Sequence, residues 1–290
     1  MIRTTSTDII RTLSELQHTG RRRGEIFEDF VESAFWTLES MPRQARSVIE
    51  GNGLQPDEGE AKEFFERLVQ RYGKYWRQFR VALGHLIEST HDVDGGYTYH
   101  DALGTVFEEW DLGGEFRGQF FTPESLCQAM VQMTVESAAE TVRRRTIDAL
   151  LPHAPVLGMM QLMGAEVRDA TLELLTKEHI AEIEIKPVRV YDPTCGSFRL
   201  PLAAASCMPR WMIDLTLVRF CGQDVDRLCY QMARCNEMLY WLNGTGIWLT
   251  VNDQESRKVT QASIALVPDT TASEVPAESD EHGQLILILD

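Results

Sequence analysis

Residues 191–198 combine an acid, a turn-forming glycine and small polar side chains, a set that suits the binding of a small ligand. The segment reads Tyr-Asp-Pro-Thr-Cys-Gly-Ser-Phe, and the β-type residues 188–191 place Asp192 at the end of a strand. In open α/β sheets ligands bind at the carboxyl ends of strands, where Gly196 would let the backbone approach and helix amides can face a carboxylate. An ordinary strand-to-helix turn has the same features, so this segment alone does not distinguish a ligand-binding site from a structural turn.

A second acidic segment, residues 220–226, follows about thirty residues later and reads Phe-Cys-Gly-Gln-Asp-Val-Asp. An acid at the tip of the second strand commonly holds a ribose through both hydroxyls. Taken alone, Asp224 could be a helix N-cap or a loop acid. Its spacing from Asp192 is that of one strand–helix–strand unit, which favours ligand binding.

Three β-type runs separated by helical stretches would position these acids. The runs are 188–191, 216–221 and 246–251, and the helical stretches between them are 199–209 and 227–242. This alternation is typical of a parallel sheet with crossover helices, so we expect an α/β fold.

The first 110 residues or so have helical periodicity and form a helical N-terminal domain. Their apolar residues recur at three- and four-residue steps, in two stripes: Phe27, Phe30, Val31, Ala34 and Phe35, then Phe64, Phe65, Leu68, Val69, Tyr72, Trp76, Leu83 and Leu86. We also expect a helix over 100–110, one over 123–145 with Thr122 as its N-cap, and mostly helix over 146–185.

The last residues are acidic and rich in Ser, Thr and Pro, with two β-like pieces at 263–267 and 285–289 that would suit edge strands. The expected domains are therefore a helical domain over 1–115, a cofactor-binding core over 116–255 and an acidic C-terminal segment over 256–290.

A third segment, Arg117–Pro123, reads Arg-Gly-Gln-Phe-Phe-Thr-Pro. With the two acidic segments, in this order and spacing, it resembles the methylase domain of N-6 adenine-specific DNA methyltransferases, best known as the modification subunits of type I restriction systems. Asp101–Gly104 and Val106–Phe107 resemble the lead-in of short plasmid- and phage-borne relatives. The resemblance covers roughly residues 100–255 and implies a Rossmann-like S-adenosylmethionine-dependent methyltransferase core.

The resemblance also assigns cofactor-binding roles. The Gln-Phe-Phe-Thr-Pro segment would line the methionine end of S-adenosylmethionine, the first acidic segment would form the turn beneath it, the second would hold the ribose, and an Asn-Asp pair would contact the adenine. These residues are Gln119, Phe120, Phe121, Thr122, Pro123, Asp192, Pro193, Cys195, Gly196, Ser197, Asp224, Asp226, Asn252 and Asp253.

Two departures from the family pattern affect function. Phe198 stands where the family has a second glycine, and its side chain would either crowd the cofactor or pack against the sheet. The Pro-Pro-aromatic loop that holds and stacks on a flipped adenine is missing, because no Pro-Pro pair occurs before the chain ends at Asp290. We therefore expect no catalytic residue here, and a chain that is inactive alone although its family methylates adenine in DNA.

The net charge of −16 bears on partners. A protein that grips DNA unaided usually has a basic face, whereas basic residues here cluster only at 21–23 and 143–145. These clusters could touch phosphate or lie at solvated helix ends. If DNA is the target, a partner chain such as a restriction–modification subunit would supply much of the affinity.

The remaining composition points to no metal and no membrane. The six cysteines include no Cys-x-x-Cys pair, and the seven histidines include no pair at metal-ligand spacing. No apolar run reaches the roughly eighteen residues of a membrane span and no signal peptide is evident, so we expect a cytoplasmic protein.

Three functional interpretations stay open. In the first, the chain belongs to the catalytic family, and its missing loop is supplied by another chain or lost by truncation. In the second, it is a non-catalytic regulator or decoy that binds cofactor, DNA or a modification complex. In the third, it is a structural or interaction module on a degenerate methylase fold. The intact motifs favour retained cofactor binding, the acidic composition favours partner binding, and neither observation selects one interpretation.

Overall fold

The computed structural model describes residues 6–113, 121–132, 135–155, 157, 165–242, 246–249 and 287–289. The chain divides into two compact units. The first, called the helical unit here, comprises Met1–Thr122, Gly196–Arg199 and Asp226–Tyr240, and the second, the sheet unit, comprises Pro123–Cys195, Leu200–Val225 and Trp241–Asp290.

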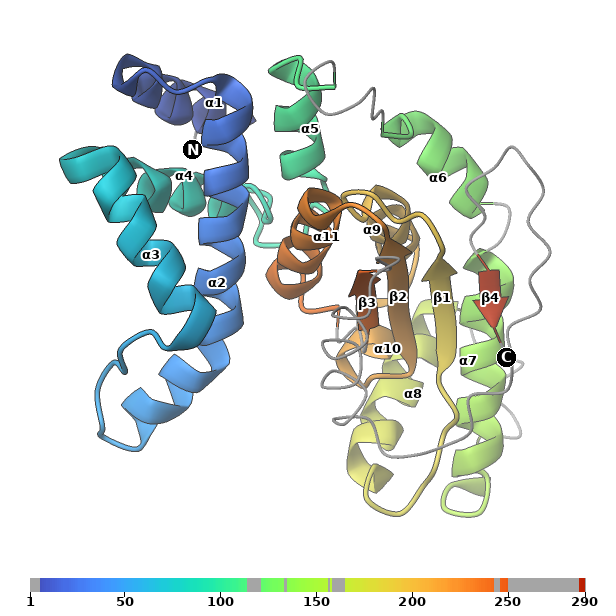
Figure 1. Cartoon of the computed structure of the whole chain (residues 1–290). Helices are drawn as coiled ribbons and strands as arrows, with labels where there is room; N and C mark the ends of the chain where they lie inside the picture. The colour runs from blue at the N-terminus through green and yellow to red at the C-terminus, as the bar shows by residue number, and fades with distance from the viewer. Residues whose placement is uncertain are drawn as a thin grey trace. The chain divides into compact units, whose positions relative to one another are not determined.

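The helical unit contains six α-helices and two short 3-10 turns among its described residues (Figure 1). Their bounds are α1 Ser6–Ser14, η1 Glu15–Thr19, α2 Arg23–Ile49, α3 Gly59–Tyr72, η2 Gly73–Trp76, α4 Arg77–Glu88, α5 Ala102–Glu109 and α11 Arg227–Leu239.

The expected apolar stripe of the first long helix forms the core of this unit. Phe27, Phe30, Val31 and Ala34 have no exposed surface, which is the outcome that their three- and four-residue steps predict. In the second stripe the same spacing buries Phe64, Leu68 and Tyr72 but leaves Val69 exposed.

The helix α11 joins the helical unit although it follows far along the chain. It packs against α2, and two ion pairs span the contact. Arg227 lies 3.1 Å from Glu32, and Arg234 lies 2.5 Å from Glu39. Burial raises the pKa of Glu237, beside Arg234, to about 7.

The sheet unit is an α/β arrangement. Its strands β1 Val188–Asp192, β2 Val218–Asp224, β3 Gly246–Leu249 and β4 Leu287–Leu289 lie in the order β3-β2-β1-β4. The strands β1, β2 and β3 are parallel to one another, and β4 lies at the edge of the sheet, antiparallel to β1. Its helices are α6 Glu124–Gln132, α7 Val135–Leu150, α8 Ala165–His179, α10 Arg210–Asp214 and most of α9 Arg199–Ser206.

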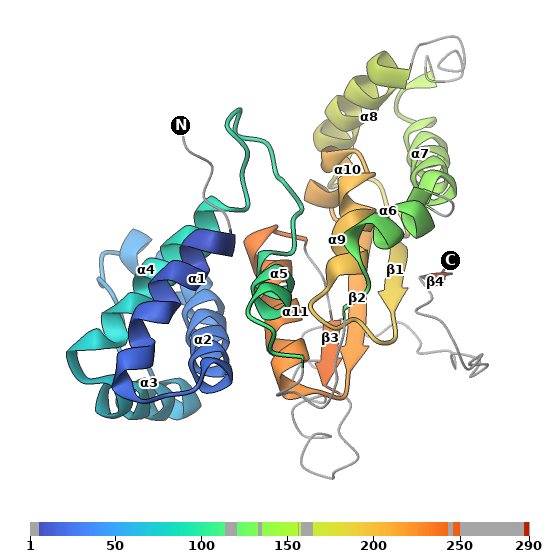
Figure 2. The same ribbon diagram turned by 90° about the horizontal axis from the view of Figure 1, so that it is seen from above.

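The helices α7 and α10 pack against β1 and β2, respectively, and α7 also packs along α8. Viewed from above, α9 and α10 lie beside the strands, with α7 and α8 beyond them (Figure 2). An ion pair between Arg143 of α7 and Asp169 of α8, with nitrogen–oxygen distances of 2.8 and 2.9 Å, joins the two helices.

The strands lie close to their expected positions, with one difference at the start of β2. The run was expected from Thr216, but Thr216 has a φ of +60° and β2 begins at Val218. The amide of Thr216 donates to the carbonyl of Ile213, and the amide of Leu217 donates to the carbonyl of Met212. Thr216 and Leu217 therefore belong to the turn that follows α10. Of the two β-like pieces near the end, the later contains β4, and 263–267 lies outside the described residues.

Two helices, α6 and α7, occupy the segment 123–145 where one helix was expected. Residues 133 and 134, between them, lie outside the described residues. Each of the six cysteines is a thiol outside any disulfide, and Cys207 alone among them is exposed. No helix in the described part of the chain has the length and apolar character needed to cross a membrane.

Candidate functional site

Two acids mark the carboxyl ends of neighbouring parallel strands in the sheet unit. The register pairs Asp192, the last residue of β1, with Gly222 of β2, and β2 continues to Asp224. The two carboxylates therefore lie at the same edge of the sheet and interact electrostatically. This edge is where ligands of parallel sheets bind.

The carboxyl group of Asp192 is the most unusual polar group at this edge. The residue has no exposed surface, and its Oδ1 accepts a hydrogen bond of 3.0 Å from the amide of Thr194. Its Oδ2 is buried and has no hydrogen-bond partner among the described residues. Burial, with a smaller contribution from the negative charge of Asp224, raises the pKa of Asp192 to about 6.

The turn that follows β1 is fixed to the neighbouring strand. The amide of Cys195 donates a 2.9 Å hydrogen bond to the carbonyl of Gln223, and the Cys195 side chain is buried. This bond places the turn across the carboxyl ends of both strands. The thiol packs as a small apolar group.

The turn needs a glycine at position 196 for two reasons: its backbone conformation, and the close approach of the Phe121 ring. Its φ of +50° lies in the left-handed region, and a Cβ atom there would stand 3.0 Å from two ring carbons of Phe121. The next residues of the chain, Gly196–Arg199, belong to the helical unit.

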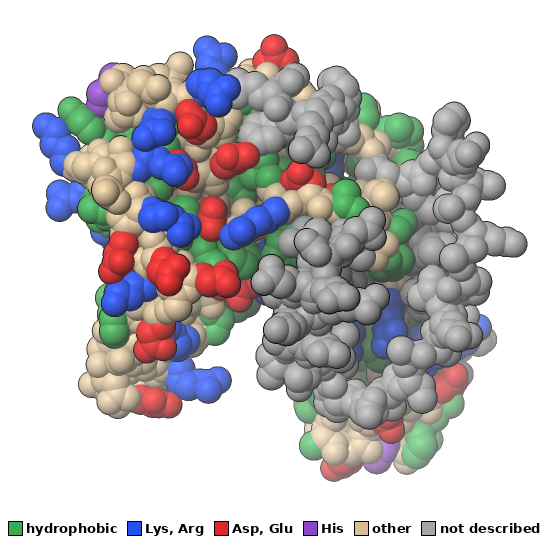
Figure 3. Space-filling model, viewed as in Figure 1, with side chains coloured by type: hydrophobic (Ala, Val, Ile, Leu, Met, Phe, Trp, Pro, Cys, Tyr) green, Lys and Arg blue, Asp and Glu red, His purple; other side chains and the backbone are tan. Residues whose placement is uncertain are grey.

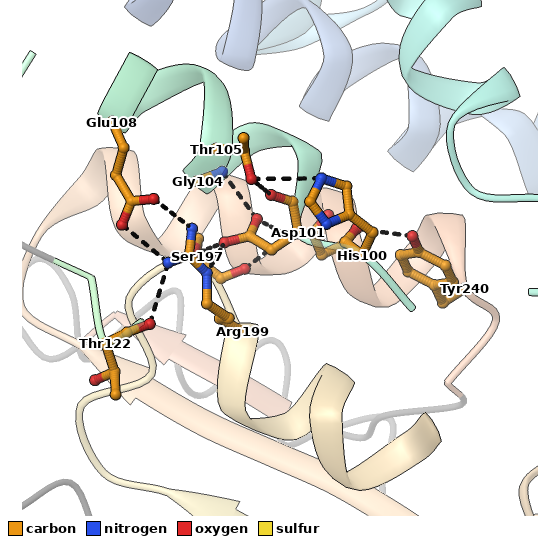
Figure 4. Close-up of polar contacts among 10 residues, drawn as sticks. His100, Asp101, Gly104, Thr105, Glu108, Thr122, Ser197, Arg199 and Tyr240 are labelled. Atoms are coloured by element: carbon orange, nitrogen blue, oxygen red, sulfur yellow. Dashed lines mark hydrogen bonds and ion pairs between the residues drawn. The ribbon is translucent and has the colours of Figure 1, made fainter. Parts of the chain in front are cut away.

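A buried carboxylate, Asp101, organises those residues within the helical unit (Figure 4). Asp101 is 2% exposed and caps α5 by accepting a 2.9 Å hydrogen bond from the amide of Gly104. It also accepts hydrogen bonds from the Ser197 hydroxyl at 2.5 Å, the Arg199 Nε at 3.1 Å and the Asn236 amide at 3.0 Å. We call these four side chains the Asp101 network.

The guanidinium of Arg199 extends this network to two further groups (Figure 4). It donates to both carboxylate oxygens of Glu108 at 2.9 and 3.1 Å and to the carbonyl of Thr122 at 3.1 Å. Burial lowers the pKa of Arg199, but the charges of Asp101 and Glu108 more than offset this, and the pKa is raised. The buried charges are thus paired and hydrogen-bonded, as buried charges must be.

Three of the expected site residues contact the Asp101 network, and these contacts fix their positions. The Ser197 hydroxyl is bonded to Asp101, so Ser197 fastens the turn. Thr122 is half-buried, and its carbonyl is bonded to Arg199. Phe121 is half-buried, with its ring against Phe107 and 5.8 Å from the Arg199 guanidinium.

Asp226 and Phe198 also have local structural tasks. The Asp226 carboxylate caps α11 by accepting hydrogen bonds from the amides of Leu228 and Cys229 at 2.8 and 3.0 Å. Phe198 has no exposed surface, so its ring packs in the interior, and its φ of +77° is a conformation that favours glycine.

Pro123 is exposed, and Pro193 is half-buried at the start of the turn. Gln119, Phe120, Asn252 and Asp253 lie outside the described residues. Asp101, Arg199 and Asn236 were missed as site residues by sequence reasoning. Only the first was noticed, in the Asp-Ala-Leu-Gly lead-in, and its N-cap position before an apolar helix was the available signal.

Comparison of the chain with protein-family models, with curated protein sequences and with solved structures gives no match. The function proposed below therefore depends on the residues themselves.

Proposed function

We propose that this chain is an S-adenosylmethionine-binding protein of the adenine-specific DNA methyltransferase kind that lacks the catalytic Pro-Pro-aromatic loop. The observation that carries the proposal is the buried Oδ2 of Asp192 at the carboxyl end of β1, which has no hydrogen-bond partner in the described part of the chain. A buried carboxylate oxygen is costly unless a cation or donor meets it. S-Adenosylmethionine carries an ammonium and a sulfonium group, and it supplies an activated methyl group when bound.

The second strand end supports the same ligand. Asp224 lies at the carboxyl end of β2, next to Asp192 in space, where an acid can accept hydrogen bonds from two ribose hydroxyls. The Cys195–Gln223 bond holds the intervening turn, so the two acids would meet the two ends of one nucleoside-like ligand. The Gln-Phe-Phe-Thr-Pro motif adds the resemblance to the family.

Calorimetric titration of the full chain with S-adenosylmethionine and with S-adenosylhomocysteine tests the proposal. We expect binding of both, and weaker binding by Asp192→Asn, because the neutral amide cannot pair with the ligand's cationic groups. Asp214→Asn, at an exposed position of α10, is the matched control and should bind as the wild type does. Absence of both heat and thermal shift with either ligand at millimolar concentration would contradict the proposal.

A second candidate is a non-catalytic regulator or decoy that binds DNA or a modification complex. The absence of any Pro-Pro pair favours a non-catalytic role, and the net charge of −16 favours binding to a modification complex over direct binding to DNA. On the face that Figure 3 shows, the Lys and Arg side chains of the helical unit alternate with Asp and Glu side chains. Co-purification with the modification subunits of a host, without methyl transfer by the chain, would favour this second candidate.

A further inference from the structure

We propose that His153, His179 and Glu182 form a zinc-binding site in the sheet unit. His153 lies in the turn after α7, His179 is the last residue of α8, and Glu182 lies in the turn that follows. One ligand atom from each comes within 4.8 Å of the other two. No local motif predicted this site, because the two histidines come from different helix ends.

Two of the three ligand-to-ligand distances lie close to those of a tetrahedral zinc centre. Glu182 Oε2 lies 3.3 Å from Nδ1 of His153 and 3.1 Å from Nδ1 of His179. Zinc bonds of about 2.0–2.2 Å to nitrogen and oxygen require ligand atoms to be about 3.3–3.5 Å apart. The two imidazole rings lie face to face at a tilt, with centroids 4.9 Å apart.

Backbone hydrogen bonds fix the turns that carry His153 and Glu182, and an ion pair joins the two helices that lead to the site. The amide of His153 bonds to the carbonyl of Leu150, and the amide of Glu182 bonds to the carbonyl of His179. The Arg143–Asp169 ion pair ties α7 to α8 with a separation of 26 residues, the same offset that separates the two histidines. The helices therefore run side by side in one direction and bring their carboxyl-terminal turns together.

The chemistry of this donor set favours zinc over the common hard cations. Two neutral imidazoles and one carboxylate suit zinc, whereas magnesium and calcium prefer oxygen ligands only. Three protein ligands would leave a fourth position for water or a ligand. Without a metal, the Glu182 carboxylate is hydrogen-bonded to His179 and lies 3.3 Å from Nδ1 of His153. Variants of the three residues separate the metal-bound and metal-free states.

Zinc affinity of the full chain is the test, measured by competition with a chromophoric chelator and by calorimetry. The exposed thiol is removed first by Cys207→Ser, so that it cannot bind zinc itself. We expect one zinc ion per chain and a rise in melting temperature with zinc. His153→Ala and His179→Ala should each weaken zinc binding at least about tenfold, as losses of even indirect partners do. Cobalt in place of zinc should give the visible absorption of a tetrahedral site.

Two further variants sharpen the result. Glu182→Gln keeps a hydrogen-bond acceptor for the histidines but is a poor zinc ligand, so it should keep the metal-free melting temperature and lose the zinc affinity. His85→Ala is the matched control, because His85 and Glu88 have the same three-residue spacing on a helix without a second histidine. Zinc binding weaker than about 0.1 mM, or affinity unchanged in His153→Ala and His179→Ala, would overturn the proposal.

Discussion

At the scale of single residues, the ionisation of Asp192 affects both stability and binding. Burial raises the pKa of Asp192 in the folded chain to about 6 from an ordinary value of 3.8. Between these values the folded chain holds a proton that the unfolded chain has released. The free energy of unfolding therefore falls as the pH rises through about 4 to 6, and the ionised group costs on the order of 2–3 kcal/mol above that window.

We therefore predict that Asp192→Asn stabilises the ligand-free protein at pH 7.5, by about 1–3 kcal/mol, and that the gain shrinks toward pH 4. Melting temperatures of the two proteins across this pH range are the measurement. Asp214→Asn, at an exposed ion pair, should show no such gain. A variant that is less stable than the wild type at pH 7.5 would mean that the Asp192 carboxylate is paired in the ligand-free chain.

A second prediction concerns Asp224, the last residue of β2, and Asp226, the N-cap of α11; the two acids have different roles. Asp224→Ala should weaken S-adenosylmethionine binding, by about 1.5–3 kcal/mol, because a charged acceptor for two hydroxyls is lost. Asp226→Ala should change binding little but lower the free energy of unfolding by about 0.5–2 kcal/mol, because Asp226 caps α11. Calorimetry and thermal melts on both variants would reveal the opposite pattern if the ribose were held by Asp226.

At the scale of elements, the start of α5 depends on a glycine with no room for a side chain. A Cβ atom on Gly104 would lie 1.9 Å from Asp101 Oδ2 and 2.8 Å from the Ser197 hydroxyl. The carboxylate cannot swing aside, because four donors hold it. Gly104→Ala must therefore break the network, and we predict a loss of about 2–4 kcal/mol of stability.

The control for this prediction is Gly84→Ala in α4. A Cβ atom there meets nothing within 4 Å, so the change should raise stability by up to about 1 kcal/mol through helix propensity. Equal stability of the two variants in denaturant unfolding would show that the Asp101 network contributes little.

Local patterns predicted most of the elements. Alternating burial along β1 and the three- and four-residue steps of α2 are short-range signals, and both elements form where those signals place them. Thr216 was one exception, because its β propensity was outweighed by a turn in which its φ is positive. The acids at the ends of β1 and β2 were predictable for the same reason, since each follows its own strand.

Those local patterns could not predict side-chain contacts between residues that are far apart in the sequence. Asp101 meets Ser197, Arg199 and Asn236 across separations of 96 to 135 residues, and no periodicity encodes such contacts. The histidine pair was missed for the same reason, since motif spacing detects only ligands that are close in sequence. Phe198 illustrates a further limit, because its glycine-like φ of +77° becomes visible only in three dimensions.

At the scale of the whole molecule, we predict that the chain alone does not methylate DNA. Transfer to adenine needs the base out of the stack, its amine held by acceptors and its ring clamped by an aromatic side chain. No Pro-Pro-aromatic loop is present to do this, and a net charge of −16 opposes encounter with a polyanion. A radiolabelled methyl-transfer assay on adenine-rich duplex and single-stranded DNA is the measurement. Incorporation above a cofactor-only blank that Asp192→Ala abolishes would contradict this prediction.

The helical unit is assembled from segments that leave the ribosome at different times. Its first 122 residues are synthesised early, yet α11 follows about a hundred residues later and only then can pair Arg234 with Glu39 on α2. At about 5–20 residues per second, this interval lasts roughly 5–20 s. During it, the α2 surface that later meets α11 is available to a chaperone, and ribosome-bound chains arrested before α11 should be cleaved by protease at α2 sites that full-length chains protect.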